Sequence, residues 1–271
     1  RIDLTKRIIG LNSHLNIYSL NEKINNYDLK KIFSDLDKSS FLKYYKAIEG
    51  NGLIIKNNNS KGVLIKGYDF FNNNHYILNS IIKGSVIKNN KNVLLIGDSL
   101  ASEMNISVGD KIKIAIPKTD KTLLGNIPRF KTLEVIGIFD LGLYEYDSRL
   151  IFIPSEVSRK LLLYDDNIYN KIEFYINDPN NIDQFKNEVQ NNIDKNELDT
   201  FYVVSWKDVN KTLINALKVE KNVMFIILSL IILVASLNII SGLIIFVKEK
   251  NKDIGILKTM GMENISIVKI F

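Results

Sequence analysis

The feature that most constrains this chain is the segment 223–247, VMFIILSLIILVASLNIISGLIIFV, which contains no charged residue. As a helix it would be about 37 Å long, enough to cross a hydrocarbon core of about 30 Å. A buried helix of a water-soluble protein is the alternative, but such helices rarely stay uncharged for so long. The segment lies far from the N-terminus, which argues against a signal peptide. The sequence therefore predicts a transmembrane helix.

Small and polar side chains interrupt this apolar segment, among them Ser236, Asn238, Ser241 and Gly242. Small residues let helices approach closely in lipid, and an asparagine can hydrogen-bond across a helix interface. A single membrane anchor needs neither, so the pattern favours a helix that packs in a bundle. Lysines flank both ends, and the tighter group at 248–252 favours a cytoplasmic C-terminal side.

Residues 1–207 have the mixed composition of a water-soluble domain. Apolar or alternating runs predict strands at 52–55, 62–67, 93–96, 111–116, 132–139, 150–153 and 172–176. These strands alternate irregularly with predicted helices, and several have hairpin spacing, so we expect an α+β domain with mixed sheets. Residues 208–222 are predicted to form a polar-faced helix that leads into the span. It would be either a passive stalk or a rod that transmits rigid-body motion.

Composition excludes several kinds of site. The chain has no cysteine, which excludes disulfides, thiolate catalysis and cysteine-ligated metals. Its only histidines are His14 and His75, too few for a multi-histidine metal site. The net charge of +6 comes from dispersed lysines without interleaved aromatic residues, so we expect no nucleic-acid partner. We also expect no cofactor or metal in this chain.

The motif GDSL at 97–100 follows a predicted strand and resembles the nucleophile block of GDSL-type esterases. A serine nucleophile needs a general base within hydrogen-bond reach. In those esterases the histidine follows the serine, whereas both histidines here precede Ser99. The sequence instead favours a strand that ends at Gly97 and a helix capped by Asp98 or Ser99.

No phosphate-binding P-loop motif occurs in the sequence, and we identify no catalytic residues. The segment 117–130, PKTDKTLLGNIPRF, lies between two predicted strands and is therefore predicted to be a hairpin extension or a long loop. Leu123, Leu124 and Ile127 stand there among polar and turn residues. Apolar side chains on an exposed loop indicate either a partner contact or a packing contact.

The residues after the span resemble a known family. Residues 248–261, KEKNKDIGILKTMG, resemble the cytoplasmic loop after the second membrane helix of FtsX/MacB-type ABC permeases. In that family a charged stretch leads into a segment that couples the permease to its partner ATPase. The resemblance assigns this coupling role to Asp253, Ile254, Gly255, Ile256, Leu257, Lys258, Thr259, Met260 and Gly261.

Further stretches resemble one branch, the LolC/LolE family of lipoprotein-releasing permeases. Residues 7–15 are similar to the segment after their first membrane helix, and 97–110 to their G-x-x-L-A…L-x-V-G-D element. Residues 138–147 are similar to the stretch after their central strand. The resemblance covers almost the whole chain. It implies a MacB-like periplasmic core for residues 1–207, a membrane helix before Arg1, and another that starts within 248–271.

In this family a hairpin of the LolC-type subunit, called the hook, recruits the periplasmic lipoprotein carrier, with a pattern close to Pro-Met-Gly-x-Ile-Pro-x-x-Arg. The residues that fall on this pattern are Leu123, Leu124, Gly125, Asn126, Ile127, Pro128 and Arg129. Leu123 replaces the proline, Leu124 the methionine, and Lys131 stands where arginine is usual. These departures leave open whether the chain is LolC-like, LolE-like or a single combined subunit.

The resemblance implies a multi-pass inner-membrane permease subunit with a periplasmic domain. Its complex would release lipoproteins from the bacterial inner membrane and pass them to a periplasmic carrier. The implied partners are an ABC ATPase that binds ATP and magnesium, a second identical or different permease subunit, the carrier and the lipoprotein cargo. The alternative is a related permease for small-molecule efflux or for mechanical signalling to cell-wall hydrolases. A hydrolase that uses Ser99 is a more distant alternative.

Overall fold

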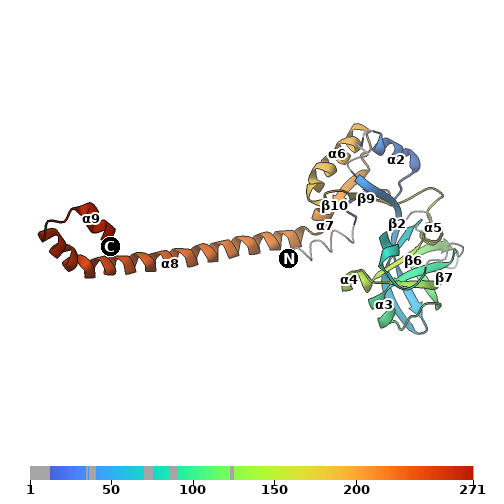
Figure 1. The fold of residues 1–271 in the computed structure, drawn as a ribbon. Coiled ribbons are helices and arrows are strands. Elements are labelled where there is room, and N and C mark those ends of the chain that lie inside the picture. Colours follow the sequence, from blue (N-terminus) through green and yellow to red (C-terminus); the bar gives the residue numbers. More distant parts are fainter. Residues whose placement is uncertain are drawn as a thin grey trace. The chain divides into compact units, whose positions relative to one another are not determined.

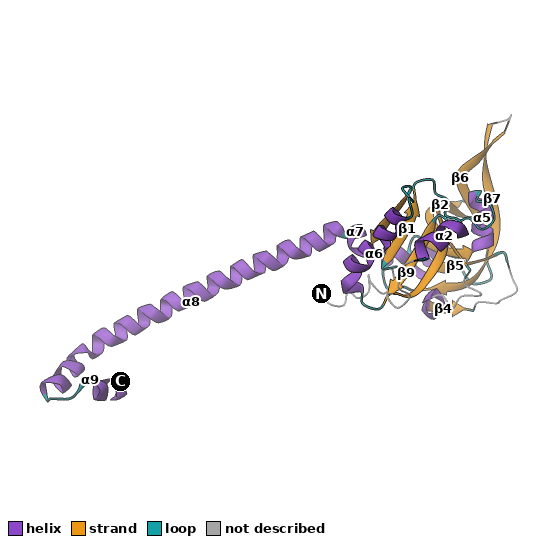
Figure 2. Ribbon diagram, turned by 90° about the horizontal axis from the view of Figure 1, so that it is seen from above, coloured by secondary structure: helices purple, strands orange, loops and turns teal. Residues whose placement is uncertain are grey.

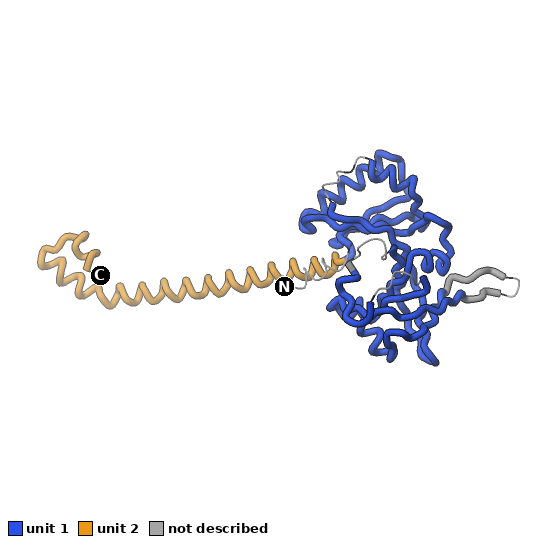
Figure 3. Tube along the Cα trace, turned by 45° about the vertical axis from the view of Figure 1, so that its right-hand side comes forward, with its two compact units in different colours: residues 1–209 blue, residues 210–271 orange. Residues whose placement is uncertain are grey.

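A computed structural model describes residues 13–34, 36, 41–69, 76–85, 91–122 and 125–270. Its strands are β1 (Leu15–Ser19), β2 (Phe41–Lys56), β3 (Asn59–Tyr68), β4 (Ile81–Gly84), β5 (Val93–Gly97), β6 (Lys111–Thr122), β7 (Gly125–Phe139), β8 (Leu150–Pro154), β9 (Lys171–Ile176) and β10 (Phe201–Ser205). Its helices are α2 (Asn26–Phe33), η1 (Tyr76–Ser80), α3 (Asp98–Glu103), α4 (Tyr144–Asp147), α5 (Ser155–Leu162), η2 (Pro179–Asn181), α6 (Ile182–Lys195), α7 (Trp206–Val209), α8 (Lys211–Thr259) and α9 (Asn264–Ile270). The chain divides into two compact units, Arg1–Val209 and Asn210–Phe271 (Figure 3).

One mixed sheet of ten strands organises the first unit, in the order β10-β1-β9-β2-β3-β8-β5-β7-β4. Strand β6 pairs with both β2 and β7, and this closes β2, β3, β8, β5, β7 and β6 into a barrel. The pairs β3–β8 and β5–β7 are parallel, whereas the neighbouring pairs β2–β3 and β5–β8 are antiparallel. The predicted α+β domain with mixed sheets is therefore confirmed.

The open end of the sheet carries two helices on one face (Figure 1). There Phe33 of α2 and Phe185 of α6 both pack on Phe174 of β9, with ring centroids 5.5 and 5.6 Å apart. We call β1, β9, β10, residues 41–47 of β2, α2 and α6 the helical lobe. The barrel strands form the barrel lobe, whose interior is lined mainly by isoleucine, leucine and valine side chains.

Strand β2 belongs to both lobes, which the sequence did not predict. Its residues Phe41–Ala47 pair with β9, and Ile48–Lys56 pair with β3. The strand is buried on different sides along its length, so it lacks one regular alternation, and only 52–55 were predicted as strand. The predicted strands at 52–55 and 62–67 lie within β2 and β3, which are longer and meet at a tight turn where Asn57 has φ of +53°. Asparagine tolerates this conformation better than most residues.

A cluster of buried charges joins the two lobes along β2. The carboxylate of Glu173 on β9 lies 2.9 Å from the Lys171 ammonium and 3.2 Å from that of Lys66, and it accepts a hydrogen bond of 2.6 Å from the Tyr68 hydroxyl. Lys171 also pairs with Glu49 at 2.8 Å. Burial alone would raise the pKa of Glu173, but the two ammonium groups and the hydroxyl hold its pKa far below the ordinary value. These five residues form what we call the junction cluster.

The second unit consists of the long helix α8, which runs without a break from Lys211 to Thr259, and α9. The predicted helix start at residue 208 was wrong, because Asp208 belongs to α7. Its carboxylate accepts a hydrogen bond from the Ser205 backbone N–H at 2.8 Å and pairs with Lys186 at 2.7 Å. These contacts hold the short helix α7 against the end of β10, separate from α8. Among the described residues, α8 is the helix long and apolar enough to cross a membrane.

Candidate functional site

The segment predicted as the hook is the hairpin of β6 and β7, which extends beyond the rest of the sheet as a two-stranded ribbon (Figure 2). Residues 111–116 pair with 129–134, the register shifts, and residues 119–122 then pair with 125–128. Pro128 lacks a backbone N–H, so its place beside this shift disturbs the ladder little. The segment is therefore a hairpin extension and not a long loop.

The predicted carrier contacts divide into three groups. Leu123 and Leu124 lie outside the described residues. Gly125, Asn126, Ile127 and Pro128 form the first part of β7. Arg129 stands nearer the sheet, where its Nη1 donates a hydrogen bond of 3.1 Å to the Lys160 carbonyl oxygen of α5. This bond ties the base of the hairpin to the helix beside it.

A cavity of about 490 Å³ lies at the base of the hairpin, between β7 and α5. Its positively charged lining residues are Lys91, Arg129, Lys131 and Lys160. Its lining carboxylate, Glu156, pairs with Lys91 at 3.3 Å. The Phe130 ring at the cavity is 51% exposed, and the Lys113 Nζ lies 5.2 Å from its centroid. The base of the hairpin thus presents cations beside an exposed aromatic ring, a surface that complements an acidic protein face.

The residues predicted to pack in the membrane do not all share one face of α8. Because successive helical residues turn by about 100°, Asn238, Ser241 and Gly242 lie on one side, and Ser236 lies about 160° from Asn238. The Ser236 hydroxyl donates a hydrogen bond of 2.8 Å to the Ile232 carbonyl oxygen of its own helix. Asn238, Ser241 and Gly242 are therefore the members of this set that can meet one neighbouring helix.

The predicted coupling segment forms the end of α8 and a tight turn. The residues from Asp253 to Thr259 are helical. The Met262 N–H donates to the Leu257 carbonyl at 3.2 Å and the Gly261 N–H to the Lys258 carbonyl at 3.1 Å, the paired bonds of a Schellman motif. Gly261 has φ of +86°, a conformation that strains any residue with a side chain. The glycine therefore allows the chain to turn into α9.

Apolar side chains lie on two sides of this turn. Ile254 and Leu257 of α8 are half-buried, Ile267 of α9 is buried, and the two helices are in contact. Ile256 and Met260, one helical turn apart, are 59% and 78% exposed. An exposed apolar pair at a tight turn is a surface that a partner protein can cover.

The GDSL motif has a packing role. Gly97 ends β5 and is itself the N-cap of α3, and no side chain caps this helix, so the predicted capping by Asp98 or Ser99 was wrong. A Cβ atom at residue 97 would lie 2.2 Å from the Asp147 carbonyl oxygen, which explains the glycine. Ser99 is an ordinary residue of the first helical turn.

The structure also separates Ser99 from His14. His14 lies beside β1 and β9 in the helical lobe, where its Nδ1 accepts a hydrogen bond of 2.9 Å from the Ile176 N–H. Ser99 follows β5 of the barrel lobe, and His75 lies outside the described residues. Within the described ranges, no group of three histidine, aspartate or glutamate side chains is arranged to hold a metal ion.

Residues 31–192, more than half of the chain, match the family of the MacB-like periplasmic core domain. The chain belongs to this family. Two solved structures are similar to it: the periplasmic region of MacB from Actinobacillus actinomycetemcomitans (TM-score 0.48, 13% identity, 78% of this chain and 96% of that one), and the extracellular domain of the noncanonic ABC-type transporter YknZ from Gram-positive bacteria (TM-score 0.46, 12% identity, 72% and 100%).

Among curated relatives, this MacB-like chain is 33% identical to the lipoprotein-releasing system transmembrane protein LolC of Neisseria meningitidis serogroup B over 178 residues. It is 28% identical to the corresponding protein LolE of Haemophilus influenzae over 183 residues. Each alignment covers 66% of this chain and 42% of the relative, so the chain spans about two fifths of their length. The resemblance to LolC/LolE permeases is confirmed.

Proposed function

We propose that the chain is the periplasmic core, second membrane helix and coupling turn of a permease subunit that releases lipoproteins from the bacterial inner membrane. The observation that carries this proposal is the 33% identity to LolC over 178 residues. The β6–β7 hairpin and the apolar helix α8 support it, because a carrier-recruiting subunit needs an exposed element on one side of the membrane and an anchor within it.

In this proposal the hairpin receives the periplasmic carrier. Its base supplies cations and the exposed Phe130 ring, which would contact an acidic rim of the carrier while the apolar tip inserts into it. A second permease subunit would pack on the Asn238, Ser241 and Gly242 face of α8 or on other membrane helices. ATP and magnesium would be bound by a separate ATPase, which would meet the turn at Ile256 and Met260.

Site-specific photocrosslinking tests the role of the hairpin. The full-length permease, with a photoreactive benzoylphenylalanine at position 127, is reconstituted in vesicles with its ATPase and mixed with the purified carrier. We expect a crosslink to the carrier. A matched variant carries the same group at Leu20, which is 70% exposed on the helical lobe, and should give none.

Deletion of residues 122–129 provides the complementary test. It should abolish lipoprotein transfer to the carrier while leaving the ATPase activity of the complex intact, since the deleted strands lie beyond the barrel. Transfer at the unaltered rate, or equal crosslinking from positions 127 and 20, would contradict the hook assignment. Retained transport of a small molecule without the carrier would favour an efflux permease.

Two glycine substitutions test the coupling turn. A Cβ at Gly255 meets no atom within 4 Å in this chain, so Gly255→Leu should keep the helix and disturb only a partner. Gly261→Leu should instead strain the turn itself. We expect both to leave ATP hydrolysis measurable and to lower lipoprotein release per ATP. If the Gly255→Leu variant released lipoproteins at the wild-type rate, the face of α8 at Gly255 would not contact the ATPase.

A further inference from the structure

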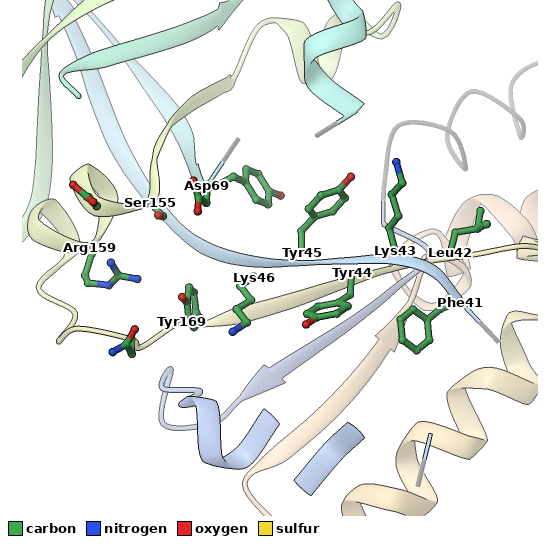
Figure 4. A pocket seen from close by; sticks show the side chains of 13 residues that line it. Phe41, Leu42, Lys43, Tyr44, Tyr45, Lys46, Asp69, Ser155, Arg159 and Tyr169 are labelled. Atoms are coloured by element: carbon green, nitrogen blue, oxygen red, sulfur yellow. The ribbon is translucent and has the colours of Figure 1, made fainter. Parts of the chain in front are cut away.

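A groove of about 800 Å³ runs along the first half of β2 in the helical lobe (Figure 4). One edge of residues 41–47 pairs with β9, whereas β3 pairs with β2 only from Ile48 onward. In the part of the chain that the structure describes, no strand pairs with the other edge of residues 41–46. The groove lies along this edge, between the end of β3 at Tyr68 and the start of α5 at Ser155.

Two cations in the groove lie on one tyrosine ring, and neither forms an ion pair with a carboxylate of the residues that the structure describes. The Lys46 Nζ and the Arg159 guanidinium carbon lie 5.2 and 5.4 Å from the centroid of the Tyr169 ring. All three side chains lie on the same side of the β2 ribbon (Figure 4). Lys46 donates to the neutral Asn26 side chain at 2.8 Å, and the Arg159 Nε is buried with no hydrogen-bond partner among the described residues.

The carboxylates that line this groove do not neutralise those cations. Glu156 pairs with Lys91, and Asp69 lies on the opposite side of the β2 ribbon (Figure 4). Burial lowers the pKa of Lys46 because it disfavours the charged ammonium form. Arg159 is half-buried, but its buried Nε–H lacks a partner among the described residues, and a bound carboxylate would supply an acceptor.

We propose that this groove binds an extended polypeptide segment that carries carboxylate side chains. The segment would add to the open edge of β2 at residues 41–46 through main-chain hydrogen bonds. Its carboxylates on one face would reach Arg159 and Lys46, and Tyr44 and Tyr169 would pack against its side chains. The groove volume falls within the range of about 300–1,000 Å³ typical of ligand sites.

The test uses the full chain in detergent and a fluorescein-labelled hexapeptide of alternating valine and aspartate, with binding followed by fluorescence anisotropy. We expect saturable binding, and none of a peptide in which lysine replaces aspartate. A peptide N-methylated at alternate amides, which cannot complete a strand ladder, should bind about tenfold more weakly or worse. This binding does not depend on lipoprotein release, because neither ATPase nor carrier is present.

Matched variants locate the site. Lys46→Gln/Arg159→Gln should weaken binding about tenfold or more, whereas Lys30→Gln/Lys111→Gln, which removes two exposed cations elsewhere, should leave it unchanged. Fluorescence of the buried Trp206, the only tryptophan, shows that each variant is folded. No binding up to about 1 mM peptide, or unchanged binding of the N-methylated peptide, would overturn the proposal. Full displacement by inorganic phosphate or phosphatidylglycerol would also overturn it and reveal a simple anion site.

Discussion

The junction cluster offers a sharp test of how the two lobes are held together. The perturbation is Glu173→Gln, which keeps the size of the side chain but removes the negative charge between Lys171 and Lys66. Glu173 is fully buried, and its carboxylate receives three polar contacts of 2.6–3.2 Å. After the substitution, Glu49 would be the remaining acidic group of the cluster to balance two buried ammonium groups.

Removing one partner of a buried ion pair typically costs about 3–5 kcal/mol, because the other charge stays desolvated. We therefore expect Glu173→Gln to lower the free energy of unfolding of the first unit by about that amount, a large share of the roughly 5–15 kcal/mol of an average domain. The control is Glu156→Gln, which breaks the exposed pair with Lys91 and should cost less than about 1 kcal/mol.

Urea unfolding in detergent, followed by fluorescence of Trp206, measures both variants, since this buried residue lies in the first unit. The pH dependence adds a second criterion. The folded pKa of Glu173 is depressed, so its stabilisation is present above its ordinary pKa of about 4.5 and is lost as pH falls below that value. Glu173→Gln should therefore flatten the loss of stability in acid. Equal stability of Glu173→Gln and Glu156→Gln would refute this reasoning.

Three further predictions rest on single contacts. Burial, with a smaller contribution from the Asp140 carboxylate, raises the pKa of Asp147 to about 6, so stability should fall as pH rises from about 4 toward 6. Asp147→Asn should remove that fall in pH-dependent urea unfolding, and an unchanged slope would contradict the assignment. Gly97→Ala should lower the free energy of unfolding by about 1–3 kcal/mol, because the new methyl group would clash with the Asp147 carbonyl oxygen, whereas Ser99→Ala should lower it by less than about 0.5 kcal/mol. Labelling of Ser99 by a serine-reactive probe would support the hydrolase alternative. Asn238→Leu should lower the stability of the membrane-embedded permease by about 0.6–1.7 kcal/mol in thermal unfolding, and Ser236→Leu should not, whereas the reverse order would place the packing face on the other side of α8.

Local patterns in the sequence were enough for several elements. The uncharged run 223–247 predicted a membrane-length helix, since charge and hydropathy are local properties. Short apolar runs predicted the α+β class and most strands. The prolines and apolar residues of 117–130 predicted an exposed element, and the resemblance to LolC/LolE permeases supplied its proposed role.

Other features had no local signal. Strand β2 changes its partner at Ile48, which a pattern of buried and exposed residues within one strand cannot reveal. The N-cap at Gly97 depends on the backbone of Asp147, fifty residues away. The turn after α8 is another example, because only the folded backbone shows that Ile256 and Met260 are exposed whereas Ile254 and Leu257 are half-buried.

The sequence by itself determined that this chain contains a membrane-length helix and a MacB-like domain, and that its histidines cannot serve an esterase. Only the tertiary structure brought Lys46, Arg159 and Tyr169 together from a strand, a helix and a loop. It alone placed Glu173 between two lysines inside the protein. The physical reason is that hydrophobicity and helical period act between neighbours in the chain, whereas charge balance and open strand edges depend on which distant segments become neighbours in space.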